Sequence, residues 1–117
     1  GLAIAPANFG ELSGDLLVGN FGDGLINAFD ATTGAFRGTL DDPSGNPINI
    51  DGLWALMFGN GAAAGPTNRL FFTAGIQGED HGLFGVIDPV PEPGSLALLA
   101  MGLLGMAACR RRRPGPR

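Results

Sequence analysis

Side chains that could bind a metal or take part in catalysis gather in two loops of this 117-residue chain. The first loop carries Asn20 and Asp23, and the second carries Glu79, Asp80 and His81. Carboxylate and amide oxygens suit calcium, and an imidazole beside carboxylates suits other divalent metals. The spacing matches no EF-hand or zinc motif, however, and adjacent side chains rarely all face one ion. We therefore interpret these residues as solvated turn residues, with a metal site at Asp23, Glu79, Asp80 and His81 as the minor alternative.

The sequence offers a single histidine for acid–base catalysis. His81 is the only one, so a Ser/His/Asp mechanism would have to use it. The chain has no Gly-X-Ser-X-Gly elbow, and the glycine-rich residues 19–24 lack the lysine of a phosphate loop. The sequence thus names no catalytic residue and implies no cofactor, with calcium in the two loops as the alternative.

Trp54 and Cys109 are each the only residue of their type. A single cysteine excludes an internal disulfide framework and a CxxC zinc site, so stability must come from packing. We interpret Cys109 as a small apolar residue rather than a nucleophile. We expect Trp54 to be a core aromatic in the first strand of a repeat, with stacking on a sugar as the alternative.

The end of the chain has three parts of different chemistry. Residues 90–95, which include Pro91, Glu92 and Pro93, form a stiff polar hinge. Residues 96–109 are apolar or small, and with residue 95 they would make a helix of roughly 22 Å, marginal against the roughly 30 Å hydrocarbon core. A basic tail, residues 110–117, favours the cytoplasmic side and so places the body across the membrane. A buried helix at the end of a soluble domain is the alternative. The arginines that directly follow the apolar segment are Arg110, Arg111, Arg112 and Arg113.

This order of proline motif, apolar segment and arginine cluster resembles the PEP-CTERM protein-sorting signal. The resemblance implies processing near Pro91-Glu92-Pro93 by an exosortase, a membrane transpeptidase, in a Gram-negative bacterium that makes exopolysaccharide or biofilm. The tail would then be an address that is removed, as in a GPI signal. We expect residues 96–109 to lie in the inner membrane before processing. The body would be periplasmic, on the cell surface or extracellular.

Charge and composition separate the body from this tail. Residues 1–92 hold all eleven acidic side chains and two of the seven arginines. An acidic body lacks the Lys and Arg that phosphate contacts need, so we expect no nucleic-acid partner. The 21 glycines, with scattered Phe, Val, Ile and Leu, favour short strands and tight turns.

The body also contains an internal repeat, with units at about 1–45 and 46–89 joined by a loop over residues 41–51. We predict four antiparallel strands in the first unit, and a hairpin over residues 30–34 in which Gly34 takes a positive φ. The second unit repeats three strands and stops at Pro89, where a fourth is expected. The aligned segments are 2–5 with 54–57, 15–19 with 69–73, and 24–30 with 82–88. The first four strands are predicted at 2–5, 15–20, 24–30 and 35–40.

Four short strands per repeat is typical of a propeller blade. The phrase Asn27-Ala28-Phe29-Asp30-Ala31-Thr32-Thr33-Gly34 resembles blades of NHL and quinoprotein-like propellers. The body as a whole resembles the end of a family of propeller-like proteins that carry PEP-CTERM signals. The resemblance implies an all-β fold of two four-stranded blades from an incomplete propeller. Because two blades cannot close a ring, we expect a C-terminal piece of a longer protein; a two-sheet β-sandwich is the alternative.

Two functions remain open at this point. The first is an exported binding or matrix-associated protein, with exosortase as processing partner and exopolysaccharide as a further partner. The second is a propeller enzyme, a lactonase-like hydrolase or quinoprotein-type dehydrogenase, with most of its active site in other blades. Since nothing in the body is arranged for chemistry, we favour the first and expect the chain not to be an enzyme.

Overall fold

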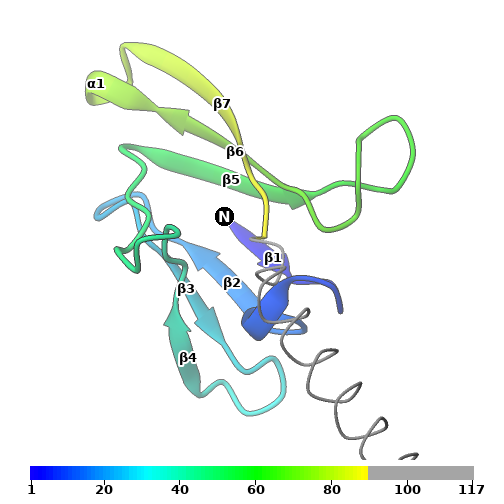
Figure 1. Ribbon diagram of the computed structural model, residues 1–117. Helices are drawn as coiled ribbons and strands as arrows, with labels where there is room; N and C mark the ends of the chain where they lie inside the picture. Colours follow the sequence, from blue (N-terminus) through cyan, green and yellow to red (C-terminus); the bar gives the residue numbers. More distant parts are fainter. Residues whose placement is uncertain (90–117) are drawn as a thin grey trace, which may run out of the picture.

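The computed structural model describes residues 1–89, which form two antiparallel β-sheets around a shared core (Figure 1). The strand order is β1-β2-β3-β4 in the first sheet and β5-β6-β7 in the second, so each sheet is a meander. Two short helical turns, η1 (Gly10–Leu12) and α1 (Ile76–Glu79), lie in the β1–β2 and β6–β7 connections. The strands are β1 (Leu2–Ile4), β2 (Leu16–Gly19), β3 (Ile26–Phe29), β4 (Phe36–Thr39), β5 (Leu53–Phe58), β6 (Leu70–Gly75) and β7 (His81–Ile87).

The predicted class, mostly β with antiparallel sheets, is confirmed, and each strand predicted in the first unit lies within two residues of an observed one. The second sheet has three strands within residues 1–89, as predicted up to Pro89, and not the four of the complete blade that the resemblance implied. These sheets do not close into a propeller. The predicted hinge at 90–95, the predicted transmembrane helix at 96–109 and the predicted basic tail at 110–117 lie outside the described residues. None of the helices within residues 1–89 is long and apolar enough to cross a membrane.

The two sheets are meanders with the same register between their second and third strands. Leu16 pairs with Phe29 across β2 and β3, and Leu70 pairs with Ile87 across β6 and β7. These pairs match the sequence alignment residue for residue. The two units therefore present equivalent side chains at equivalent places.

The first strands correspond as well, but two residues away from the predicted alignment. The sequence alignment matches Leu2 with Trp54. In the structure, Leu2 pairs with Val18, and the equivalent pair in the second sheet is Leu56 with Phe72, so Leu2 corresponds to Leu56. A β-bulge at the start of β5 accompanies the shift. Because side chains alternate with period two, a two-residue shift keeps the same face, and the apolar pattern could not detect it.

Each sheet therefore has two faces that correspond between the repeats, here called face A and face B. Residues that pair directly across neighbouring strands share a face. In the first sheet, face A carries Ala3, Leu17 and Ala28, and face B carries Leu2, Ile4, Leu16 and Phe29. In the second sheet, face A carries Met57, Phe71 and Val86, and face B carries Leu56, Phe58, Leu70 and Ile87.

The core lies between face A of the first sheet and face B of the second. Leu17 and Leu70 are both fully buried there, at 0% exposure. The two sheets approach each other closely at Gly19, where an added Cβ would lie 2.8 Å from a methyl group of Leu53. The ring of Phe58 meets that of Phe9, from the β1–β2 connection, edge to face at 5.1 Å. The remaining core residues are Ala5, Ile26, Ala28, Leu40, Ile50, Leu56 and Ala74.

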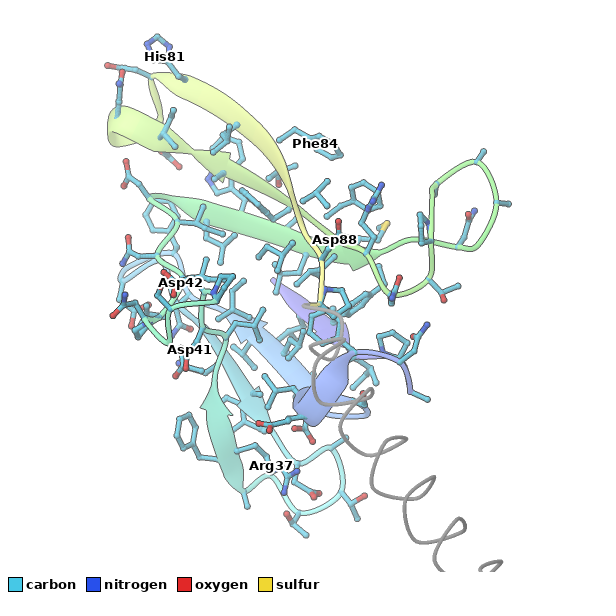
Figure 2. The ribbon with its side chains drawn as sticks, in the orientation of Figure 1. Arg37, Asp41, Asp42, His81, Phe84 and Asp88 are labelled. Carbon is cyan, nitrogen blue, oxygen red and sulfur yellow. The ribbon has the colours of Figure 1, made fainter. Side chains whose placement is uncertain are left out.

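The predicted loop over residues 41–51 joins the two sheets and is tied by its own side chains. The Asp42 carboxylate accepts hydrogen bonds from the backbone N–H groups of Ser44 (2.8 Å) and Asn46 (3.0 Å). Figure 2 shows Asp42 beside the end of β4. Near the end of the loop, Ile50 is buried, and its N–H donates to the Gly24 carbonyl (2.9 Å). The loop thus holds the second sheet against the first.

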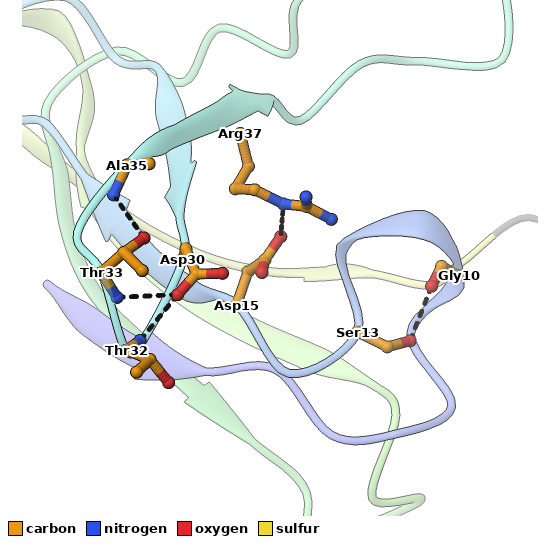
Figure 3. A network of polar contacts seen from close by, with 8 residues as sticks. All are labelled: Gly10, Ser13, Asp15, Asp30, Thr32, Thr33, Ala35 and Arg37. Carbon is orange, nitrogen blue, oxygen red and sulfur yellow. Dashed lines mark hydrogen bonds and ion pairs between the residues drawn. The ribbon is translucent and has the colours of Figure 1, made fainter.

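The predicted hairpin between β3 and β4 is confirmed (Figure 3). Gly34 has φ +76°, a conformation that glycine adopts without a steric penalty. The Asp30 carboxylate accepts hydrogen bonds from the N–H groups of Thr32 and Thr33, each 2.8 Å long. The Asp30 backbone N–H donates to the Ala35 carbonyl (2.8 Å) and closes the turn.

Candidate functional site

The two loops with candidate metal ligands are equivalent connections, β2–β3 and β6–β7. In the first, the Asn20 N–H donates to the Leu25 carbonyl (2.9 Å), and the Asn20 carbonyl accepts from the Gly24 N–H (3.0 Å). The Asp23 carboxylate accepts from the Leu25 N–H (3.0 Å). The amide of Asn49 also donates to the Asp23 carbonyl (2.6 Å). Asp23 is thus engaged in forming a turn, as in an Asx turn.

The second loop has an unusual backbone. Gln77 and Glu79 have φ of 54° and 69°, in the left-handed region that residues with a Cβ rarely adopt. The Asp51 carboxylate, from the linking loop, accepts a hydrogen bond from the Gln77 N–H (2.9 Å). A carboxylate oxygen of Glu79 accepts from the indole N–H of Trp54 (3.2 Å). The side chains around this loop therefore hold its own conformation.

The structure does not gather the candidate ligands into a metal centre. Within residues 1–89, no group of three or more His, Cys, Asp and Glu side chains is placed to hold an ion. His81 lies at the start of β7, at the tip of the second sheet, and is exposed (Figure 2). Glu79 and Asp80, its neighbours in sequence, are exposed too.

Trp54 is not a core residue, so the expectation of a core aromatic is wrong. Its side chain is 43% exposed. The indole lies over Gly75, where an added Cβ would overlap the ring, and its N–H is bonded to Glu79. The bulge at the start of β5 explains the difference, because it shifts the alternation of buried and exposed positions there.

Two ion pairs lie within residues 1–89, one in each sheet. Arg37 Nε donates to Asp15 Oδ2 (3.3 Å; Figure 3), and Asp15 is the buried partner at 5% exposure. In the second sheet, Arg69 makes two hydrogen bonds to Asp88, of 2.9 and 3.2 Å. The hydrogen bonds that Arg69 donates to the Asp88 carboxylate, and then the negative charge of Asp88, raise the pKa of Arg69. Because this second pair is exposed, it contributes little to stability.

An apolar groove on face A of the second sheet was not predicted from the sequence. Phe71 and Phe84 stack there with ring centroids 5.6 Å apart and planes 19° from parallel. Met57 and Phe84 are 70% and 67% exposed, and Figure 2 shows Phe84 on the side of β7 away from the first sheet. The loop before β6 forms one wall, where Gly65 lies against the Phe71 ring. The cavity measures about 540 Å³.

The chemistry of this groove is uniform. Of the residues that line it, Thr73 alone has a polar side chain, and none is charged. A sequence signal for the groove did exist, because β5 reads Leu-Trp-Ala-Leu-Met-Phe with apolar residues on both faces. Such continuous apolar runs indicate a strand covered on both sides. In the described part of the chain, only face B of this sheet is covered.

Two chemically distinct regions follow from this arrangement: a β-repeat body with an open apolar face, and the segment after β7. Residues 89–113 match the PEP-CTERM protein-sorting motif. The match contains the Pro-Glu-Pro triplet and the four consecutive arginines, as predicted. The chain therefore carries a sorting motif of this type. Such a motif implies export, with a tail anchored in the membrane until an exosortase processes it.

The chain is similar to parts of two viral proteins. It is 44% identical over 85 residues to uncharacterized protein R648 of Acanthamoeba polyphaga mimivirus, covering 71% of this chain and 20% of that protein. It is 45% identical over 56 residues to uncharacterized protein L690 of the same virus, covering 48% of this chain and 15% of the relative. The chain thus spans a fifth or less of the length of these relatives. No solved structure matches it.

Proposed function

We propose that this chain is an exported bacterial surface or extracellular protein, processed by an exosortase through its C-terminal signal, whose β-repeat body serves in binding or matrix association. The PEP-CTERM motif at residues 89–113 carries the proposal. It begins only two residues after β7 ends at Ile87, so the folded body leads directly into the signal. Exopolysaccharide is the partner that we propose for the body in a biofilm setting.

We further propose that the body belongs to the propeller-like class. Both units are antiparallel meanders with the same register, and face A of one packs on face B of the next. Stacking of equivalent units in one direction is how repeat proteins bury a continuous core. A larger array of such units, of which this chain would be the C-terminal piece, is compatible with relatives that extend well beyond the matched region.

The test of sorting is the mass and location of the protein in a host that has an exosortase. We expect the unmodified chain to lose its tail and leave the inner membrane. A variant with Pro91, Glu92 and Pro93 changed to alanine should stay uncut in the membrane. A control variant with Pro114 and Pro116 changed to alanine lies beyond the matched motif and should be processed normally.

A host without an exosortase and a binding measurement on the body complete the experiment. In a host without an exosortase, the unmodified chain should remain uncut. An uncut tail in the exosortase-bearing host would overturn the proposal, and so would equal processing of the Pro91, Glu92 and Pro93 variant. For the body, the measurement is binding to isolated exopolysaccharide. Binding by the folded protein that is lost in a denatured sample would support matrix association. No binding by the folded protein would refute that partner.

A further inference from the structure

The interface between the two sheets joins two different surfaces. Face A of the first sheet, with Leu17, packs on face B of the second, with Leu70. Because the two sheets are equivalent units, this is a head-to-tail contact rather than a symmetric one. Within residues 1–89, such a contact leaves two faces without a neighbouring sheet: face B of the first sheet and face A of the second.

Both unused faces are apolar and exposed. On face B of the first sheet, Leu2 and Ile4 are 65% and 58% exposed. They correspond to Leu56 and Phe58, which contact the core in the second sheet. Face A of the second sheet corresponds in the same way to the buried face of the first. Each open face therefore matches one half of an interface that the chain already makes.

The shape and chemistry of the open face A favour an apolar protein surface as its ligand. The groove of about 540 Å³ has room for projecting side chains. Its walls offer a single side-chain hydroxyl, from Thr73, which is a poor match for a polar ligand such as a sugar. Large exposed apolar patches on soluble proteins commonly mark protein contacts. Face B of the first sheet presents projecting aliphatic side chains, Leu2 and Ile4, of the required kind.

We propose that face A of the second sheet binds face B of the first sheet of a second copy of this chain. Since every copy carries both faces, the contact is directional and each copy can bind two neighbours. The association buries apolar surface, and it brings together bodies that each carry ten acidic side chains against two arginines in residues 1–89. Screening by salt should therefore strengthen it. The inference rests on the two faces and does not depend on sorting by an exosortase. It assigns to a second copy the faces that further units of the same protein would cover in the larger array proposed above. A mixed cross-link would therefore count against that array at these two faces.

Cross-linking between two differently tagged full-length variants in membranes tests this geometry. Cys109 is first replaced by serine, so that no native thiol reacts. One variant then carries Met57→Cys on face A and the other carries Ile4→Cys on face B; both positions are well exposed, so neither change disturbs the core. We expect a short bifunctional thiol reagent to join the two variants when they are mixed. Each variant alone should give no cross-linked pair.

Three controls make every outcome informative. Adding Phe84→Glu to the Met57→Cys variant places a charge in the groove and should lower the yield at least roughly tenfold. Pairing the Met57→Cys variant with a Ser44→Cys variant, in the linking loop, should give only background. Added salt should raise the yield of the mixed pair. No mixed cross-link, equal cross-links within single variants, or a yield that falls with salt would each overturn the proposal.

Discussion

The two sheets of this protein share register and sequence pattern, yet they bury opposite faces. Leu16 and Leu70 occupy the same place in the two repeats, but Leu70 is fully buried whereas Leu16 is only partly covered. The reverse holds for Leu17, which is fully buried, and Phe71, which lines the groove. The comparison shows that a repeat does not decide by itself which face becomes core. The neighbour that packs on it decides.

The largest expected difference between the sheets comes from a matched pair of leucine substitutions. Leu70→Ala should lower the free energy of unfolding by about 3 kcal/mol, because it removes side-chain atoms from the closed core. Leu16→Ala should cost about 1 kcal/mol, in proportion to the smaller apolar area that it covers. Denaturant unfolding at low protein concentration, followed by the fluorescence of Trp54, measures both. Equal losses would show that face B of the first sheet is also covered.

A smaller effect is expected at a glycine pair in β7. Gly85→Ala should destabilise by about 1–2 kcal/mol, since its new Cβ would overlap the ring of Phe72, which is packed against the core. Gly82→Ala is the matched control, because nothing lies within 4 Å of its Cβ position, and it should change stability by less than about 0.5 kcal/mol. The position equivalent to Gly85 in the first sheet is Asn27, whose side chain is accommodated on the open face B and accepts from Thr39 (2.8 Å).

If Gly85→Ala were as stable as the unmodified protein, the Phe72 ring would have to move freely. That outcome would contradict a closely packed face B in the second sheet. Thermal unfolding of the two glycine variants, side by side, gives the comparison directly.

The smallest expected effect concerns the two aspartates that end the third strands, Asp30 and Asp88. Hydrogen bonds from the Thr33 and then the Thr32 N–H groups lower the pKa of Asp30 below its usual 3.8. A lowered pKa in the folded state means that the charged form stabilises the fold. This contribution is present above the unfolded pKa and is lost as the pH falls through the folded value.

The pKa of Asp30 can be measured by NMR titration in the acid range. Asp30→Asn, which keeps an acceptor oxygen but cannot ionise, should remove this part of the acid sensitivity of stability. Asp88→Asn is the control, because Asp88 accepts from Arg69 and not from a hairpin turn. A pKa of Asp30 at or above 3.8 would contradict the structure of the turn.

Local features of the sequence determined much of the body. The alternation of apolar residues predicted the strands, and the Asp30-to-Gly34 phrase predicted the hairpin, because turn chemistry acts within a few residues. The internal repeat predicted that β6 and β7 would copy β2 and β3. The sorting motif was also determined by sequence alone, since its proline triplet, apolar segment and arginines are recognised in order along the chain.

The tertiary structure decided what neighbours in sequence cannot encode. It moved Trp54 out of the core through a bulge in β5, and it showed that Glu79 bonds to that indole instead of forming a metal site with His81. It also selected which face of each repeat is buried and left the groove beside Phe84 open. The physical reason is that burial depends on the side chains that meet across the gap between two sheets, and these come from distant parts of the chain.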